Sequence, residues 1–308
     1  AIVVSLYQRI SKLQWVRAEG LPGIVAMIDK GDYAAAFSLA SQVQECIPDD
    51  ASLRELWAQM SLECSVTTVP AGADVFVRGR SVQEGPWQYL GCTPLRKIRL
   101  ARGEYRWRFE KPRYESRECV AADSFEVALL EKGDHPEMVP IHSVTCGDYL
   151  IDKFEVTNEQ YQRFVDAGGY RNRGYWPEEL FAKQGVRVAW EHVMAEFCDQ
   201  TGQYSPSNWR DGRYPDGQGR HPVTGISWFE AAAYARFAGK RLPTVSHWFE
   251  AAQTQDLSLI LPYSNFGRTS APVGTYPGMG RHGLYDMAGN AREWCWNSTD
   301  DAGAQRYI

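Results

Sequence analysis

Oxygen-bearing residues gather in the segment 286–293, close to the end of the 308-residue chain. Asp286 and Glu293 supply carboxylates, while Gly289 and Asn290 between them allow a tight turn that directs backbone carbonyls inward. Hard cations such as Ca²⁺ bind carboxylate and carbonyl oxygens in loops of this kind. The pattern therefore favours a Ca²⁺ loop, and the alternative is a capped turn that carries two surface carboxylates.

Thiol chemistry has less support in the sequence. The seven cysteines are spread singly, and no pair has the C-x-x-C spacing of zinc knuckles and redox motifs. Cys295 stands alone between Trp294 and Trp296, and we predict that it is a buried core thiol. The histidines are separated and share no ligand spacing, so we expect most of them to form hydrogen bonds in caps and loops. The sequence assigns no catalytic residue.

Helices must hold the 286–293 loop in place, and their start signals are clear. Thr157 with Gln160, and Ser227 with Glu230, have the spacing of capping boxes, and Thr244 is a third candidate cap. Between these helices the chain is rich in Trp, Tyr, Gly and Pro. We therefore expect aromatic side chains buried under long loops, with little regular sheet.

Four ordered sequence blocks carry a family resemblance in this part of the chain. They are residues 155–158 (Glu-Val-Thr-Asn), 222–231, 241–244 (Arg-Leu-Pro-Thr) and 283–294. In this order they resemble the formylglycine-generating enzyme family, also called sulfatase-modifying factors, over about residues 138–300. The resemblance implies an α+β fold that is irregular and related to the C-type lectin fold.

The same resemblance implies metal ligands by position. A family calcium loop matches the 286–293 segment, and its implied Ca²⁺ ligands are Asp286, Gly289, Ala291 and Glu293. A second family calcium loop matches Asn265 and Phe266 in its first half. Residues 268–271 lack the carboxylate expected after them, which leaves this second site incomplete.

The activity of the family enzymes is the oxidation of a sulfatase cysteine to formylglycine by O₂ and copper(I) held by two cysteines. Two soft thiolates suit copper(I). In the family these cysteines follow the region that ends here at Ile308, so we expect a domain truncated at its C-terminus. Copper is therefore expected only if the full-length protein is the enzyme.

The preceding chain is predicted to form a helical segment over residues 1–63, a β domain over 64–129 and a linker over 130–137, before the large domain at 138–308. Two amphipathic helices, the first with a candidate N-cap at Asp32 and the second with its cap within residues 47–50, resemble a tetratricopeptide-like unit. Their expected apolar faces consist of Tyr33, Ala36, Phe37, Ala40, Val43, Leu53, Leu56, Trp57 and Met60.

Four blocks in the β domain, residues 69–75, 90–95, 103–105 and 111–115, together resemble a PEGA domain, a small all-β sandwich. Within it, alternation predicts that Tyr105, Trp107 and Phe109 share one face of a strand, with Arg106 and Arg108 on the other.

This order of domains resembles the extracytoplasmic portion of bacterial membrane-anchored Ser/Thr protein kinases, where many such domains lack the cysteine pair and bind or sense ligands. We therefore expect an extracytoplasmic sensor region, periplasmic or at the cell surface, with a membrane anchor upstream of Ala1. Its partner would be a peptide, a protein or a carbohydrate. A net charge of −5 without a clustered basic face argues against nucleic acid. The alternative is a formylglycine-generating oxidase whose active-site third is missing from this chain.

Overall fold

The computed structural model describes residues 10–80, 85–133, 135, 137–183, 186–253, 258 and 260–297. The chain divides into two compact units, Ala1–Leu129 and Leu130–Ile308, and each is described by itself. In the residues that the structure describes, no helix is both long enough and apolar enough to cross a membrane.

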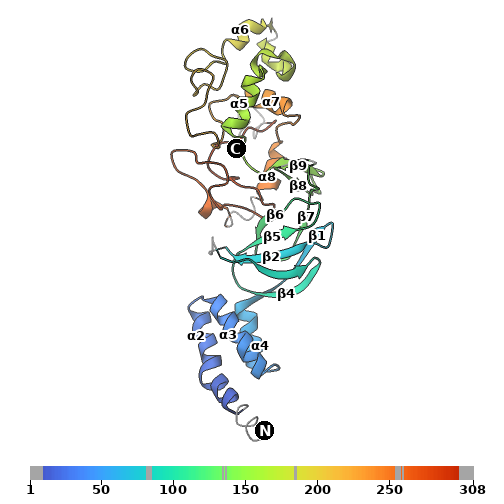
Figure 1. The fold of residues 1–308 in the computed structure, drawn as a ribbon, viewed down its shortest axis with the longest axis vertical. Coiled ribbons are helices and arrows are strands. Elements are labelled where there is room, and N and C mark those ends of the chain that lie inside the picture. Colours follow the sequence, from blue (N-terminus) through green and yellow to red (C-terminus); the bar gives the residue numbers. More distant parts are fainter. Residues whose placement is uncertain are drawn as a thin grey trace. The chain divides into compact units, whose positions relative to one another are not determined.

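The first unit begins with a small helical bundle (Figure 1). A π-helical turn, Val16–Gly20, leads into α2 (Leu21–Asp29), followed by α3 (Tyr33–Cys46) and α4 (Ala51–Met60). The predicted caps are confirmed, because Asp32 accepts from the backbone N–H of Ala35 and Asp50 from that of Leu53. Most residues of the predicted apolar stripes are buried, while Tyr33 and Phe37 are half-buried against the same core. The buried ones are Ala36, Ala40, Val43, Leu53, Leu56, Trp57 and Met60.

Two sheets enclose the second core of this unit. Their strands are β1 (Ser61–Val69), β2 (Asp74–Gly79), β3 (Gln88–Cys92), β4 (Leu95–Ala101), β5 (Tyr105–Glu110), β6 (Arg117–Ala121) and β7 (Phe125–Ala128). One sheet has the order β4-β1-β7 and the other β3-β2-β5-β6; β1 and β7 are parallel, and the other pairs are antiparallel. The arrangement is a β-sandwich, and its likeness to the PEGA family rests on the sequence motifs alone.

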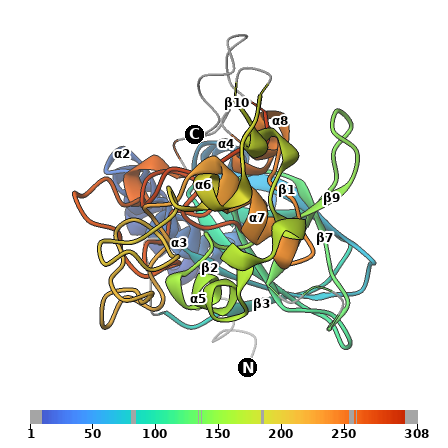
Figure 2. The same cartoon turned by 90° about the horizontal axis from the view of Figure 1, so that it is seen from above.

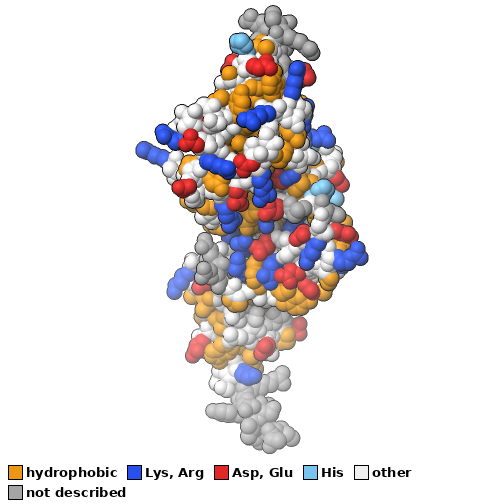
Figure 3. Space-filling view, turned by 45° about the horizontal axis from the view of Figure 1, so that its top comes forward, with side chains coloured by type: hydrophobic (Ala, Val, Ile, Leu, Met, Phe, Trp, Pro, Cys, Tyr) orange, Lys and Arg blue, Asp and Glu red, His pale blue; other side chains and the backbone are white. Residues whose placement is uncertain are grey.

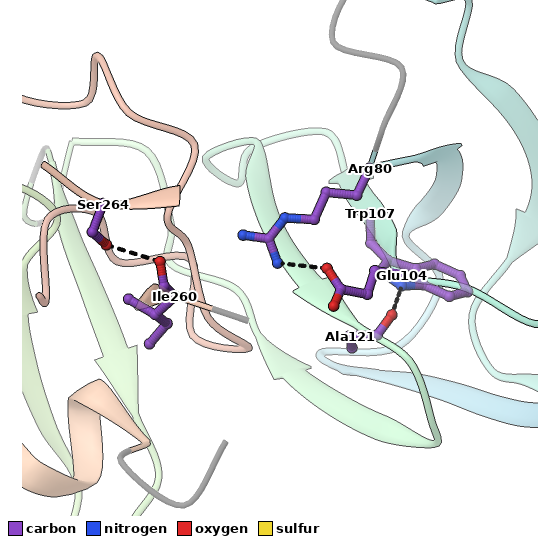
Figure 4. Close-up of polar contacts among 6 residues, drawn as sticks. All are labelled: Arg80, Glu104, Trp107, Ala121, Ile260 and Ser264. Atoms are coloured by element: carbon purple, nitrogen blue, oxygen red, sulfur yellow. Dashed lines mark hydrogen bonds and ion pairs between the residues drawn. The ribbon is translucent and has the colours of Figure 1, made fainter. Parts of the chain in front are cut away.

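Alternation along β5 places its side chains as the sequence predicts. Trp107 and Phe109 are buried in the core, while Arg106 and Arg108 point to the opposite face. The indole N–H of Trp107 donates to the carbonyl of Ala121 at 3.0 Å (Figure 4). The first strand starts at Ser61, three residues before the predicted start, because α4 passes directly into β1.

At the end of β2, Arg80 is buried and pairs with Glu104 at 3.1 Å (Figure 4). On the molecular face seen in Figure 3, Lys and Arg side chains are interspersed with Asp and Glu.

The second unit has short elements joined by long irregular segments (Figures 1 and 2). Its helices and strands are β8 (Met138–Ile141), β9 (Tyr149–Asp152), α5 (Asn158–Asp166), β10 (Ala182–Lys183), β11 (Val186–Arg187), α6 (Trp190–Met194), α7 (Trp228–Phe237) and α8 (Val245–Ala252), with short 3₁₀ turns between them. The strands of the described part pair as two-stranded ladders, β8 with β9 and β10 with β11. This confirms the prediction of little regular sheet. The sequence predicts a strand from Tyr149 up to the α5 cap at Thr157, but β9 ends at Asp152.

All three predicted helix caps of this unit are confirmed. Thr157 and Ser227 form complete capping boxes with Gln160 and Glu230, and Thr244 caps α8. Helices α5 and α7 pack beside each other around an aromatic core. The core includes Tyr161, Phe164, Tyr170, Trp176 and Trp209, with Ala233 of α7 against them.

A separate core supports the candidate site. It joins β8 and α8 to the C-terminal part of the described chain, and it contains Val139, Ile141, Trp248, Leu284, Met287 and Cys295. The segment that carries the predicted metal loop is therefore fixed by apolar contacts on both sides of residues 288–293.

Candidate functional site

Left-handed backbone conformations fold the 286–293 loop back on itself. The φ angles of Asp286, Gly289 and Asn290 are +57°, +78° and +56°. A Cβ on Gly289 would lie 2.2 Å from the carbonyl oxygen of Asn265, so this position accepts only glycine. The turn that Gly289 and Asn290 predicted is therefore present, and it is tighter than a surface turn requires.

The two carboxylates of the predicted site are drawn into the protein. Asp286 is only 4% exposed, and its Oδ2 accepts from the backbone N–H of Gly274 at 2.7 Å. Glu293 is partly buried, and its Oε2 accepts from the indole N–H of Trp248 at 2.7 Å. The alternative of a turn with two surface carboxylates is therefore wrong, because Asp286 is enclosed.

A third carboxylate, Glu155, reaches the loop from the segment between β9 and α5. Its Oε1 accepts from the backbone N–H of Ala291 at 2.8 Å, and its Oε2 accepts from Nδ2 of Asn290 at 2.6 Å. The sequence interpretation missed this role, because Glu155 precedes the loop by 135 residues. The available signal was that Glu155 opens the first of the four family blocks.

Asn265 braces the same loop from the other side. Its carbonyl accepts from the backbone N–H of Asn290 at 2.8 Å, and its side chain donates to Oδ1 of Asn290 at 3.1 Å. Oδ1 of Asn290 also accepts from the backbone N–H of Ala271 at 2.8 Å. Phe266 beside it is 63% exposed. The structure thus places Asn265, predicted for a second calcium loop, directly against the first one.

The turn before Asn265 is closed by its own side-chain contact. Ser264 Oγ donates to the carbonyl of Ile260 at 2.9 Å (Figure 4). The backbone turn that precedes Asn265 is therefore closed by a hydrogen bond of its own.

Burial raises the pKa values of all three carboxylates. Burial, followed by repulsion from Glu293 and Asp286, raises the pKa of Glu155 to about 9, although its two hydrogen-bond donors act against the shift. Burial, together with the charge of Asp286, raises the pKa of Glu293 to about 7. Burial also raises the pKa of Asp286. A cation bound beside them would oppose all three shifts, because it favours the ionised forms.

The predicted donor set combines side-chain carboxylates with backbone carbonyls. Within the described ranges, no three His, Cys, Asp or Glu side chains converge into a group that could hold a metal. Glu155, Asp286 and Glu293 thus influence one another electrostatically without meeting at one point. The predicted set is of another kind, two carboxylates with the carbonyls of Gly289 and Ala291, and it consists of the hard oxygen donors that Ca²⁺ prefers.

The thiols and histidines behave as predicted. Cys295 is fully buried, and burial followed by the charge of Glu293 raises the pKa of its thiol to about 12. All seven cysteines lie in the described part and are free. Four histidines have hydrogen-bond partners in loops and caps: His142 with Asp148, His221 with Ser270, His247 with Thr244 and His282 with Gln253.

Comparison with known proteins places this site in a family. A family model described as "Sulfatase-modifying factor enzyme 1-like domain" matches residues 108–307. The match begins within β5, before the predicted domain start at residue 138. It includes all four sequence blocks and the whole candidate site.

Three curated relatives illustrate the range of the similarity. The chain is 33% identical over 175 residues to serine/threonine-protein kinase Pkn1 of Chlamydia trachomatis, which covers 53% of the chain and 25% of the kinase. It is 32% identical over 202 residues to the formylglycine-generating enzyme of Mycobacterium tuberculosis, covering 52% of the chain and 67% of that enzyme. It is 29% identical over 190 residues to the hercynine oxygenase of Mycolicibacterium smegmatis, covering 54% of the chain and 41% of that oxygenase.

The chain spans about a quarter of the length of its kinase relatives, and the similarity concerns a region of those proteins. The family model, in contrast, matches well over half of the chain. The chain therefore belongs to the sulfatase-modifying factor enzyme 1-like family.

Proposed function

We propose that this chain is the extracytoplasmic ligand- or partner-binding region of a bacterial Ser/Thr-kinase-type protein, a sensor built on a sulfatase-modifying factor domain. The observation that carries the proposal is the similarity to chlamydial Pkn1, in which the matched region is a quarter of a protein named as a kinase. The state of Cys295 supports a binding role. Cys295 is a fully buried single thiol with a raised pKa, which disfavours the thiolate that a nucleophile needs.

Calcium binding at the 286–293 loop is part of this proposal. Asp286 and Glu293 would contribute carboxylates, and Gly289 and Ala291 would contribute carbonyls. The hydrogen bonds described above engage one oxygen of each carboxylate. Bound Ca²⁺ would offset the charge of the buried carboxylates and stiffen the loop, which is a structural role. Glu155 and Asn265 would act as braces that hold the loop in its binding conformation.

A formylglycine-generating oxidase is the second candidate, because the chain covers 67% of the mycobacterial enzyme with that name. The deciding experiment incubates the full-length protein with copper(I), O₂ and a peptide of the Cys-x-Pro-x-Arg type, and follows the peptide by mass spectrometry. The binding proposal predicts that the peptide cysteine stays unchanged.

Two controls make that result decisive. A formylglycine-generating enzyme assayed in parallel must convert the peptide, and the variant Cys295→Ser shows whether the buried thiol takes part. Conversion of the peptide by the full-length wild-type protein would overturn the binding proposal in favour of the oxidase.

A further inference from the structure

The outer faces of the two sheets in the first unit differ in kind. The face of sheet β4-β1-β7 is polar, with Thr67 donating to Glu126 at 3.1 Å and Arg99 paired with Glu63 at 3.3 Å. The outer face of sheet β3-β2-β5-β6 instead carries aromatic rings and guanidinium groups. We call it the Trp87 face, and its rings and guanidinium groups belong to Phe76, Arg78, Trp87, Tyr89 and Arg108. Asp74 lies beside them, and its Oδ1 accepts from the hydroxyl of Tyr89 at 3.1 Å.

Cation–π contacts organise the Trp87 face. The guanidinium carbons of Arg78 and Arg108 lie 4.4 and 4.7 Å from the centroid of the Trp87 ring, and that of Arg108 also lies 4.8 Å from the Phe76 ring. The Phe76 and Tyr89 rings pack with centroids 5.4 Å apart. A guanidinium held over an aromatic ring can still donate hydrogen bonds from the N–H groups at its rim.

Most charges near this face already have partners. Arg106 pairs with Glu118 at 2.6 Å, and Arg108 pairs with Glu110 at 3.0 Å. Among the residues that the structure describes, Arg78 has no carboxylate partner. A stacked guanidinium of this kind matches the two oxygens of a carboxylate.

A bulge in the edge strand β3 disfavours pairing of another strand at this edge, so the face of the sheet is the surface available to a partner. Val75 is opposite Gly91 while Phe76 is opposite Tyr89, so Leu90 is an extra residue that forms a bulge in β3. Bulges blunt an edge strand against further pairing and reorient side chains. Tyr89, beside this bulge, is 54% exposed.

We propose that the Trp87 face docks a carboxylate-bearing peptide segment of a protein partner. Arg78 takes the carboxylate through its paired N–H groups, and the exposed Tyr89 ring packs against a neighbouring apolar side chain of the segment. A sugar fits this face less well, because the Trp87 ring on which it would stack is already covered by guanidinium groups. The inference rests on the proposed binding role and names the chemistry of one partner. It uses no residue of the calcium loop.

A titration with an acidic probe tests this proposal. Fluorescein-labelled decaglutamate is titrated with the full chain at physiological salt, and binding is followed by fluorescence anisotropy. We expect saturable binding that Arg78→Ala weakens about tenfold. Arg78→Lys, which retains the charge without the planar fork, should fall between wild type and Arg78→Ala.

The matched control is Arg96→Ala, because Arg96 is an exposed arginine on β4 of the other sheet. Its expected effect is less than about twofold, the size of a general charge effect. Absence of saturable binding, or equal effects of Arg78→Ala and Arg96→Ala, would overturn the proposal. So would tighter, Arg78-dependent binding of polygalacturonate, since the ligand would then be an acidic sugar. Circular dichroism checks the fold of each variant, and calcium binding, measured separately, is expected to be unchanged in all of them.

Discussion

The β-sandwich of the first unit and the 286–293 loop of the second are stabilised by different interactions. In the sandwich, strand ladders satisfy the backbone, and side chains such as Trp107 and Phe109 need only fill the core. In the loop, side chains satisfy the backbone instead, as Glu155 does for Ala291 and Asp286 for Gly274. The loop therefore buries carboxylates, whereas the charged side chains buried in the sandwich are the arginines Arg80 and Arg117.

This difference predicts different sensitivities. The sandwich should respond to changes of side-chain volume, since its core cluster is apolar. The loop should respond to loss of single hydrogen bonds, to pH and to cations, since its buried groups are polar and ionisable. Matched substitutions in the two regions separate these expectations.

The largest expected effect is that of Trp107→Ala in the sandwich core. Trp107 is 1% exposed, so its loss leaves a large cavity and removes the hydrogen bond to Ala121, with an expected destabilisation of about 3–5 kcal/mol. Urea unfolding followed by circular dichroism measures it. Trp87→Ala on the outer face is the control and should cost about 1 kcal/mol. Equal losses would mean that the core does not determine the stability of this unit.

Asn290→Ala should have nearly the same effect without opening a large cavity. It removes the donor to Glu155 and the acceptor for the N–H of Ala271, and it puts a Cβ-bearing residue without a capping side chain at φ +56°. We expect a loss of about 3 kcal/mol in chemical unfolding. The exposed Asn208→Ala, which loses one contact to Thr224, should cost about 0.5 kcal/mol. A small effect of Asn290→Ala would contradict the polar account of the loop.

The loop should also make stability depend on pH in calcium-free buffer. The pKa of Glu155 rises from 4.5 to about 9 on folding, so the folded state retains a proton that the unfolded state loses. The free energy of unfolding is therefore greatest below pH 4.5 for this group, and it falls as the pH rises toward 9. Glu293 adds to the fall between pH 4.5 and about 7.

Glu155→Gln should flatten this profile and stabilise the protein at pH 8 relative to wild type. Glu63→Gln, on an exposed carboxylate of the sandwich, should retain the wild-type slope. Thermal unfolding across this pH range compares the three proteins. An unchanged slope in Glu155→Gln would show that this carboxyl group is not the source of the pH dependence of stability.

The smallest effects are expected at the helix caps, where substitutions in the two units should cost similar amounts of stability. Thr157→Ala and Ser227→Ala in the second unit, and Asp50→Ala in the first, should each cost about 1 kcal/mol, because each frees a backbone N–H of the first turn. Thr157→Ser should restore most of the loss. A much larger loss in the second unit would mean that its caps also support the loop.

Local signals were enough to predict most of the regular structure. Asp50 and Thr157 marked helix starts because capping depends on residues three positions apart. Alternation placed Trp107 inside the sandwich because side chains on a strand change face at each residue. The backbone turn at Gly289 was likewise readable from its residue types.

The contacts that complete the site could not be predicted in the same way. Glu155 and Asn265 lie far from residue 290 in the sequence, and their role depends on how the second unit folds. The Trp87 face was missed for a similar reason, since Arg78 and Arg108 come from different strands and meet only through the β2–β5 pairing.

Thermal unfolding with and without Ca²⁺ tests the central claim about the loop most directly. With Ca²⁺ about a hundredfold above its dissociation constant, we predict a melting temperature roughly 5 °C above that in chelator. Asp286→Ala and Glu293→Gln should abolish this difference, while Glu63→Gln should retain it. Equal melting temperatures of the wild-type chain in Ca²⁺ and in chelator would contradict the calcium loop.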